Sequence, residues 1–502
     1  MEYKPTIGME VHAELKTNTK MFCSCKNDPD EQEPNKNVCP ICLAHPGTLP
    51  TANKEAIKKV LKVGLALNCK INEFSQFDRK NYFYPDLPKG YQISQYKHPL
   101  CGPGFLEVEG KKIGITRIHL EEDTGRSIHP KGKDYSLIDF NRAGVPLMEL
   151  VTEPEINTGK QAKNFCEKLQ LILKYLDVSS ADMEKGQMRC EVNISISKDE
   201  TKGTKVEIKN LNSFKAVERS IDYEIKRQTK VLDEGKKVIQ ETRGWDEKKQ
   251  KTVSQRVKEE AHDYRYFPEP DLPPMEIGKE EPTNLDKLKS DKIYLSEIKK
   301  TMPELPQDKT KRFEEEYGLS SDQIDILVKN KDLGEYFEKV ASDLKEWVKT
   351  EEKEHELKEK KTKKLFKLAA NYIITELQKL TKKTEKEEKI ERITGENFAE
   401  LMKMIYEGEI SSSAAQKILE VMYKTQGDPS QIAQEQGLIQ MSDSSQLEEV
   451  IDKIVKENSS VVEEYKSGKE NALQFLIGQV MKETKGQANP QVAQELLFKK
   501  LK

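Results

Sequence analysis

The chain has 502 residues and a mass of 57.7 kDa, and its 84 Lys and Arg residues against 87 Asp and Glu residues give a formal net charge of −3. This length suffices for two or three domains, and no apolar run approaches the roughly 18 residues of a membrane-spanning helix, so we expect no membrane association. The near-neutral charge does not exclude nucleic-acid binding, because that affinity depends on local basic surface.

The first predicted element is a strand over residues 7–12, where apolar and polar residues alternate. Glu10 and His12 are two apart and would project from the same face of this strand. A hard cation such as Mg²⁺ could use the carboxylate and the imidazole together. The alternative is that both side chains only line the solvated face of a half-buried strand.

Four of the eight cysteines then follow at close paired spacing: Cys23, Cys25, Cys39 and Cys42 form C-x-C and C-x₂-C. Such spacing is typical of a structural Zn²⁺ site with tetrahedral sulfur ligands, and we interpret 23–42 as a zinc-binding insertion. Two disulfides are the alternative. The predicted strand begins almost at the first residue and no signal peptide precedes it, which favours a reducing compartment and therefore the metal. The other four cysteines are most simply small core residues.

The densest set of potential metal ligands lies between residues 118 and 154 and includes Glu121, Glu122 and Glu149. Adjacent carboxylates point to opposite faces of a regular strand, so Glu121 and Glu122 can serve one site only if the strand ends there. The turn-forming residues 123–125 favour such an ending. Together with the first strand, this segment predicts an acidic, metal-dependent active site.

Strand patterns, for example at 112–118 and 190–196, continue to about residue 274 and are interleaved with turns and with a helix at 160–175. They predict an α+β fold class, with a mixed α/β catalytic body built on an antiparallel-rich sheet. After the proline-rich segment 268–274, helical periodicity dominates. The predicted domains are the catalytic body 1–293, a helical domain 294–393 and a small helical tail domain 394–502.

The helical half carries a concentration of Lys and Glu between residues 346 and 391. Most of it is typical of a solvated helix surface with i,i+4 ion pairs, although the positive excess at 358–367 could contact RNA. In the tail, Ser411 and Asp428 are predicted helix-start residues. A helical bundle of this composition would serve equally as a protein docking module.

Seven motifs, in order over essentially the whole chain, resemble those of the GatB family, the B subunits of the tRNA-dependent amidotransferases. They are long and of mixed chemistry, which makes a chance match improbable. The motifs are 7–12 (IGMEVH), 77–86 (FDRKNYFYPD), 119–125 (HLEEDTG), 139–142 (DFNR), 209–213 (KNLNS), 262–270 (HDYRYFPEP) and 485–490 (KGQANP).

The resemblance implies a heterotrimeric enzyme that acts on mischarged Glu-tRNA(Gln) and, in many bacteria, Asp-tRNA(Asn). The GatB-type chain would phosphorylate the side-chain carboxyl with ATP, ammonia from a glutaminase (amidase) subunit would form the amide, and a small adaptor subunit would complete the heterotrimer. The implied Mg²⁺ ligands are His12, Glu122 and Glu149, with Glu10 and Glu121 beside the same cation or a second one. The zinc would be an accessory clip, because many family members do not have these cysteines.

No Walker-type Gly-x₄-Gly-Lys-[Ser/Thr] sequence occurs, so basic side chains and the metal would bind the phosphates. Tyr82 could stack on adenine or on the terminal nucleotide of a tRNA, whereas core packing is an equal interpretation for Phe83 and Tyr84. In the tail, Lys482 and Lys485 are candidate tRNA phosphate contacts. The remaining nucleotide-binding candidates are Arg79, Lys80, Lys89, Arg142 and Lys209.

Two other functional classes compete with this interpretation. A non-catalytic tRNA-binding scaffold would need the acidic cluster only for structure. Glutamine hydrolysis within this chain is disfavoured, because no activated Ser or Cys nucleophile is recognisable. The length leaves no space for the inserted domain of the related archaeal protein, and no Arg-rich leader is seen, so we expect a bacterial cytoplasmic protein.

Overall fold

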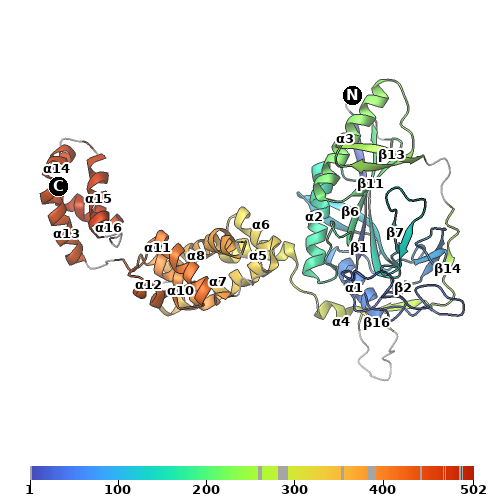
Figure 1. The fold of residues 1–502 in the computed structure, drawn as a ribbon, viewed down its shortest axis with the longest axis horizontal. Coiled ribbons are helices and arrows are strands. Elements are labelled where there is room, and N and C mark those ends of the chain that lie inside the picture. The colour runs from blue at the N-terminus through green and yellow to red at the C-terminus, as the bar shows by residue number, and fades with distance from the viewer. Residues whose placement is uncertain are drawn as a thin grey trace. The chain divides into compact units, whose positions relative to one another are not determined.

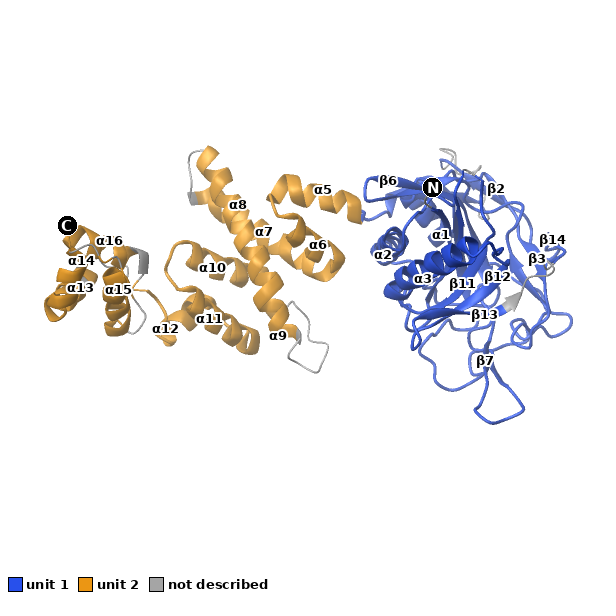
Figure 2. Ribbon diagram, turned by 90° about the horizontal axis from the view of Figure 1, so that it is seen from above, with its two compact units in different colours: residues 1–305 blue, residues 306–502 orange. Residues whose placement is uncertain are grey.

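The computed structural model describes residues 3–199, 201–257, 263–280, 292–351, 355–382, 392–440, 444–466, 469, 471–484, 488 and 490–501. The chain forms two compact units, 1–305 and 306–502 (Figure 2). The first unit is mixed and the named elements of the second are all helices, which confirms the α+β class (Figure 1). Among the described residues, no helix has the length and apolar composition that crossing a membrane requires.

The first unit is organised around an eight-stranded sheet. All neighbouring strands are antiparallel except β11 and β12, so the predicted antiparallel-rich sheet is confirmed. In spatial order the strands are β13 (Lys251–Val257), β12 (Glu241–Asp246), β11 (Val206–Leu211), β10 (Met188–Ser197), β1 (Lys4–Glu14), β9 (Pro146–Thr152), β6 (Lys111–Glu122) and β5 (Gly104–Val108).

One face of this sheet is apolar and packs against three helices, α1 (Lys54–Ala66), α2 (Gly159–Tyr175) and α3 (Phe214–Asp233) (Figure 1). Alternation along the strands produces this face, because every second side chain points the same way. The strand residues Val11, Leu120, Leu150 and Val192 and the helix residues Leu61, Leu169 and Ile221 are buried in one hydrophobic core. The opposite face is therefore left to the polar residues of the same strands.

Each of these helices begins at a side chain that accepts hydrogen bonds from the first turn. Asn53 caps α1, Thr158 caps α2 and Ser213 caps α3. Such caps typically stabilise a helix by about 1 kcal/mol. The local sequence thus fixes where each helix starts, while the apolar stripe decides which face it buries.

Smaller sheets complete the first unit. Strand β3 (Asp78–Asn81) pairs with β4 (Tyr91–Ser94) and with β14 (Phe267–Pro268), which brings the segments 77–86 and 263–270 together. The Ser94 hydroxyl donates to Glu121 Oε2 at 2.9 Å, which attaches β4 to the end of β6. The other short strands are β2 (Phe74–Ser75), β15 (Met275–Gly278), β16 (Ile293–Tyr294), β7 (Arg126–Ile128) and β8 (Leu137–Asp139).

The first unit extends past residue 293, where the sequence suggested a boundary. Helix α4 (Leu295–Lys300) packs beside α1, and its side chains Leu295 and Ile298 belong to the core of this unit. The Lys58 ammonium also lies 3.1 Å from a carboxylate oxygen of Glu297. Helical periodicity alone gives no indication of which unit a short helix covers.

The second unit contains helices with polar surfaces. Ser411 and Asp428 cap α11 and α12, as predicted. Near the C-terminus, α13, α15 and α16 share a separate hydrophobic core that includes Leu447, Leu476 and Leu497. The helices are α5 (Pro306–Tyr317), α6 (Ser321–Lys329), α7 (Lys331–Glu351), α8 (His355–Tyr372), the π-helical turn η2 (Ile373–Leu377), α9 (Gln378–Lys382), α10 (Gly395–Tyr406), α11 (Ser412–Thr425), α12 (Pro429–Glu435), α13 (Ser444–Glu457), α14 (Ser459–Lys466), α15 (Asn471–Glu483) and α16 (Pro490–Leu501).

Candidate active site

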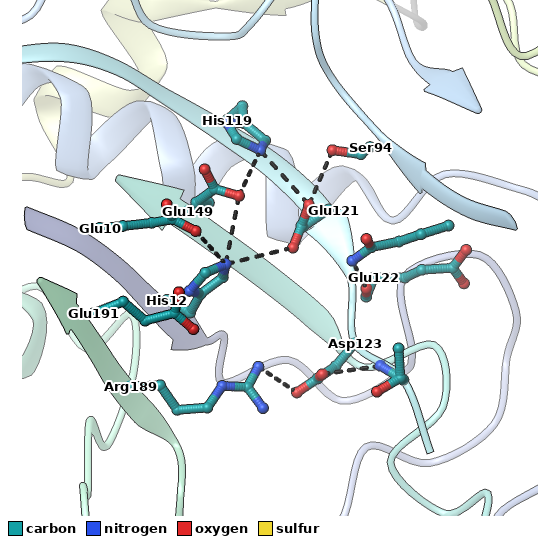
Figure 3. A network of polar contacts seen from close by, with 12 residues as sticks. Glu10, His12, Ser94, His119, Glu121, Glu122, Asp123, Glu149, Arg189 and Glu191 are labelled. Carbon is teal, nitrogen blue, oxygen red and sulfur yellow. Dashed lines mark hydrogen bonds and ion pairs between the residues drawn. The ribbon is translucent and has the colours of Figure 1, made fainter. Parts of the chain in front are cut away.

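Strand register assembles the site on the polar face of the large sheet. Strand β9 lies between β1 and β6, and its Glu149 is directly opposite His12 on one side and His119 on the other. Glu10 and Glu121 are each two residues away on the same strands and therefore face the same way. We call Glu10, His12, His119, Glu121 and Glu149 the carboxylate–imidazole cluster (Figure 3).

Both imidazoles point their Nε2 atoms at the same carboxylates. His12 Nε2 lies 3.4 Å from Glu149 Oε2, 3.8 Å from Glu121 Oε1 and 3.9 Å from Glu10 Oε1. His119 Nε2 lies 3.3 Å from Glu149 Oε2 and 3.6 Å from Glu121 Oε2. Two groups of three could therefore hold a metal ion, Glu10 with His12 and Glu149, and His119 with Glu121 and Glu149.

The electrostatics of the cluster favour positive charge. Burial opposes protonation of His119, but the charges and hydrogen bonds of Glu149 and Glu121 outweigh it and raise the pKa of His119 to about 9. The pKa of His12 is raised against burial in the same way, mainly by Glu149. Burial would raise the pKa of Glu149, yet His119 and His12 hold it well below its usual range.

Glu121 and Glu10, the other two carboxylates of the cluster, have pKa values that are shifted in opposite directions. Burial opposes ionisation of Glu121, but His119 and Lys80 lower its pKa. The pKa of Glu10 is raised, first by burial and then by the negative charge of Glu149. Excess negative charge at the Glu10 end is what a bound cation would relieve.

A cavity of about 610 Å³ opens over the cluster. This volume is within the range of small-molecule binding sites. Cations from four strands and the loop before β11 line this cavity, so positive side chains face the carboxylates of the cluster. These cations are Lys80, Arg117, Arg189, Lys205 and Lys209. Tyr82, Tyr96, Tyr264 and Tyr266 also line it, and the rings of Tyr96 and Tyr266 are stacked 4.4 Å apart.

Glu122 does not join His12 and Glu149, so the predicted ligand set is not brought together. Strand β6 continues through Glu122, and regular alternation turns this carboxylate to the other side of the strand from Glu121. Its Oε1 accepts from the Ile93 N–H at 2.9 Å and its Oε2 from Lys89 Nζ at 2.7 Å. Glu122 lines a separate cavity of about 240 Å³ beside Cys42, and Glu121 faces His12 instead.

The nucleotide-binding candidates divide between the cavity and internal ion pairs. Lys80, Tyr82 and Lys209 line the cavity. Arg79, in contrast, makes a bidentate pair with the buried carboxylate of Glu269, with Nε–Oε2 and Nη2–Oε1 distances of 2.7 and 2.8 Å. Alternation along β3 explains why neighbouring residues Arg79 and Lys80 have different partners.

Two further candidates are also engaged within the protein. Lys89 pairs with Glu122, away from the cluster. The Arg142 guanidinium donates to the backbone carbonyls of Thr124 at 3.1 Å and Gly125 at 2.9 Å. Arg142 therefore holds the turn after β6 in place, and that turn borders the cavity.

Comparison with known proteins agrees with this architecture. Residues 5–282 match the GatB/GatE catalytic domain and residues 355–501 match the GatB domain. The B subunit of the aspartyl/glutamyl-tRNA(Asn/Gln) amidotransferase of Carboxydothermus hydrogenoformans is 45% identical, over 100% of this chain and 99% of the relative. The proteins of the same name from Thermotoga petrophila (45%; 100% and 99%) and Caldanaerobacter subterraneus subsp. tengcongensis (46%; 100% of both chains) are similar. The chain belongs to the GatB family.

Several residues of this GatB-family site were not among the sequence candidates. His119 stood inside one of the seven motifs, but its ligand position depends on pairing between β6 and β9. Arg189 and Glu191 reach the cavity from β10, where they alternate with buried Cys190 and Val192. This alternation has the same form as that of Glu10 and His12, so it is the signal that could have identified them.

The cysteine cluster, Cys23, Cys25, Cys39 and Cys42, is assembled by two loops of the same unit. The four Sγ atoms lie within 4.8 Å of one another, so the cluster could hold a metal ion. A hydrogen bond from the Cys23 thiol, together with the Lys20 ammonium 3.8 Å away, lowers the pKa of Cys42 to about 4 despite burial. Cys42 is thus biased toward the thiolate, the form that binds metals.

The structure describes one of the two candidate tRNA contacts in the tail. Lys482 is exposed near the end of α15. Lys485 lies outside the described residues, as does His262 in the motif 262–270. The basic segment 358–367 lies within α8.

Proposed function

We propose that this chain is the carboxyl-activating subunit of a tRNA-dependent amidotransferase. In this proposal, ATP phosphorylates the side-chain carboxyl of Glu-tRNA(Gln), and of Asp-tRNA(Asn), and ammonia then forms the amide. The observation that carries it is the carboxylate–imidazole cluster at the floor of a cavity that Lys80 and Lys209 also line. A carboxylate is a poor electrophile, and phosphorylation supplies the leaving group that amide formation requires.

The donor set fits Mg²⁺. Its ligand atoms are carboxylate oxygens and imidazole nitrogens, and the carboxylates of Glu121 and Glu149 are buried where water is restricted. Mg²⁺ prefers oxygen ligands and keeps part of its coordination for waters and phosphates. We assign His12 and Glu149 as its ligands, with Glu10 and Glu121 beside them. A cation bound there would neutralise charge on phosphate oxygens.

The basic residues of the cavity would position the phosphates. Lys209 lies 2.7 Å from Glu191 Oε2 and 3.4 Å from Glu207 Oε1, so its ammonium is held in place before any ligand binds. Lys80 lies 5.0 Å from the Tyr264 ring centroid, and its own charge lowers the pKa of Glu121. Phosphoryl transfer depends mainly on such positioning and charge neutralisation.

The chain would also assemble with partner subunits and hold a zinc ion. The relatives are named as subunits, which supports assembly with other subunits. We propose that these are a glutaminase (amidase) subunit that supplies ammonia and a small adaptor subunit, in the bacterial cytoplasm. Zn²⁺ bound by the cysteine cluster would hold the loops around 23–42 in place in the first unit. The first unit would carry the chemistry, and the helical tail predicted over 394–502 would contact the body of the tRNA through Lys482 and Lys485.

The decisive experiment measures ADP release by the purified amidotransferase complex with Glu-tRNA(Gln) and no ammonia donor. We expect release that depends on the mischarged tRNA and falls by about 100-fold or more in His12→Ala and Glu149→Gln, because cation-mediated charge stabilisation contributes several kcal/mol. Glu153→Gln, an exposed carboxylate just after β9, is the matched control and should retain full release. If both cluster variants kept their ADP release, the chain would be a tRNA-presenting scaffold.

A further inference from the structure

The geometry points to Arg189 as the residue that binds the side-chain carboxylate of the aminoacyl group and distinguishes it from the amide of the product. This inference rests on the proposed function, because it places that substrate group in the same cavity. It concerns recognition of the aminoacyl side chain and leaves phosphate binding to Lys80 and Lys209. It predicts that the complex separates Glu-tRNA(Gln) from Gln-tRNA(Gln) through this one guanidinium.

Arg189 lies beside His12 on the polar face of the large sheet. The two residues are directly opposite each other in the pairing of β10 with β1, and both line the cavity. Adjacent strands are about 4.8 Å apart, so the two side chains are neighbours on that face. A group bound to Arg189 would therefore lie within about one strand spacing of the carboxylate–imidazole cluster, where phosphorylation is proposed.

The Arg189 guanidinium is anchored by one nitrogen, and its other nitrogens are left for a ligand. Its Nη2 donates to Asp123 Oδ2 at 2.8 Å (Figure 3). Asp123 is itself held in place, since its Oδ1 accepts from the Thr124 N–H at 2.9 Å and Arg142 Nε lies 3.6 Å from its Oδ2. Within the described part of the chain, Arg189 Nε and Nη1 form no hydrogen bond or ion pair, and 32% of the side chain is exposed. Arg189 thus presents oriented N–H donors to the cavity.

The chemistry of this guanidinium suits a carboxylate and not an amide. Burial opposes the charge of Arg189, but nearby Asp123 and Glu14 outweigh burial and raise its pKa, so the guanidinium stays charged. A planar guanidinium matches the two oxygens of a carboxylate with two parallel N–H groups. The amide of glutamine offers only one oxygen, and its NH₂ group would face N–H donors. Arg189 would therefore favour the substrate and disfavour the finished product.

Two other cations of the cavity are less suited to this contact. Lys209 Nζ lies 2.7 Å from Glu191 Oε2, and an ammonium is a point charge that offers no parallel pair of N–H groups. Arg117 Nη2 lies 4.0 Å from Glu149 Oε1, and its buried Nε has no hydrogen-bond partner among the described residues. The Arg117 guanidinium thus already faces a carboxylate of the cluster, which makes it the rival candidate that the experiment must separate from Arg189.

The test measures the dissociation constants of the purified amidotransferase complex for Glu-tRNA(Gln) and for Gln-tRNA(Gln), with Mg²⁺ and without ATP. Both ligands have the same tRNA body, so the ratio of the two constants isolates the aminoacyl side chain. We expect the wild type to bind Glu-tRNA(Gln) about 10- to 100-fold more tightly, the range that hydrogen bonds to a charged group provide. Equal binding of the two tRNAs by the wild type would overturn the inference.

Variants then assign the preference to a residue. Arg189→Met should bind the two tRNAs equally and keep the wild-type affinities for Gln-tRNA(Gln) and for ATP. Arg219→Met, which removes an exposed guanidinium from α3 of the same unit, is the control and should keep the full preference. A preference that survives in Arg189→Met, or that disappears in Arg117→Met instead, would overturn the assignment. Weaker ATP binding with an unchanged preference would also overturn it, because Arg189 would then contact a phosphate.

A second variant at the same position, Arg189→Lys, keeps a cation beside Asp123. It should lose most of the preference, because an ammonium cannot present two parallel N–H groups to a carboxylate. Full preference in Arg189→Lys would overturn the paired contact. A purely structural role of Arg189 would weaken both tRNAs alike and leave the wild-type ratio, which would overturn the inference as well.

Failure of this inference can be separated from failure of the proposed function. If the preference survived in Arg189→Met while ADP release still required Glu149, only the carboxylate contact would be rejected. If the preference depended on Arg189 while ADP release survived in Glu149→Gln, the kinase role would be rejected and the carboxylate contact would stand.

Discussion

The carboxylate–imidazole cluster and the cysteine cluster are both collections of metal-type ligands in the same unit, but the chain builds them differently. The cysteines lie within twenty residues of one another, on loops. The carboxylates and imidazoles come from β1, β6 and β9, and pairing of these strands sets their spacing. A ligand set that is local in sequence can be recognised from spacing, whereas a set that strand register assembles can be recognised only in part.

The two clusters also differ in their expected roles, which are structural for the cysteine cluster and chemical for the carboxylate–imidazole cluster. The cysteine cluster joins loops and lies beside the cavity that Glu122 and Lys89 line. The carboxylate–imidazole cluster lies on a sheet whose opposite face is a complete hydrophobic core, so the fold does not need a metal at that position. Breaking the first should therefore affect mainly stability, and breaking the second should affect mainly chemistry.

The largest effect is expected from a change at Glu121. In Glu121→Gln we expect the affinity for Mn²⁺, a probe for Mg²⁺, to fall by about 100-fold, because even residues outside the direct ligands contribute roughly 10- to 100-fold. The matched change Glu122→Gln should leave the affinity nearly unaltered, since its carboxylate pairs with Lys89. Isothermal titration of both variants measures this. Equal losses would mean that Glu122 also faces the cation.

The ion pair between Arg79 and Glu269 is a third group of charges in this unit, and unlike the two clusters its charges neutralise each other within the protein. Arg79→Met should lower the free energy of unfolding by about 3–5 kcal/mol, since the buried Glu269 carboxylate would lose its bidentate partner. Lys16→Met, which breaks an exposed pair with Asp177, should cost about 1 kcal/mol or less. Urea unfolding measures both. Unchanged stability combined with lost ATP binding would return Arg79 to the nucleotide site.

The smallest effect is expected at the cysteine cluster. Changing Cys39 and Cys42 together to Ser should remove bound zinc and lower Tm by several degrees, because metal binding contributes to folding free energy. ADP release per folded complex should stay at the wild-type level. Ser24→Ala, an exposed position between two of the ligands, is the control. Loss of ADP release with intact folding would assign the cysteine cluster a direct part in the reaction.

Sequence patterns predicted much of the fold because they are local. Alternation identified β1 and the strands around 112–118 and 190–196, and polar helix-start residues located α11 and α12 at Ser411 and Asp428. They were less informative about Glu122, because choosing between neighbouring carboxylates required knowing whether β6 ends before it. They singled out the segment and the motif that contain His119, but not its place in the site, which the pairing of β6 with β9 decides. They gave no indication of Arg189.

By itself, the sequence determined the family, the α+β class and the chemical types of the ligands. These depend on motifs and periodicities that a single segment carries. Only the tertiary structure decided that Glu149 lies between His12 and His119, that Glu121 rather than Glu122 faces them, and that Arg79 pairs with Glu269. Strand register and side-chain alternation make those choices, and both are fixed when distant segments pair around a common core.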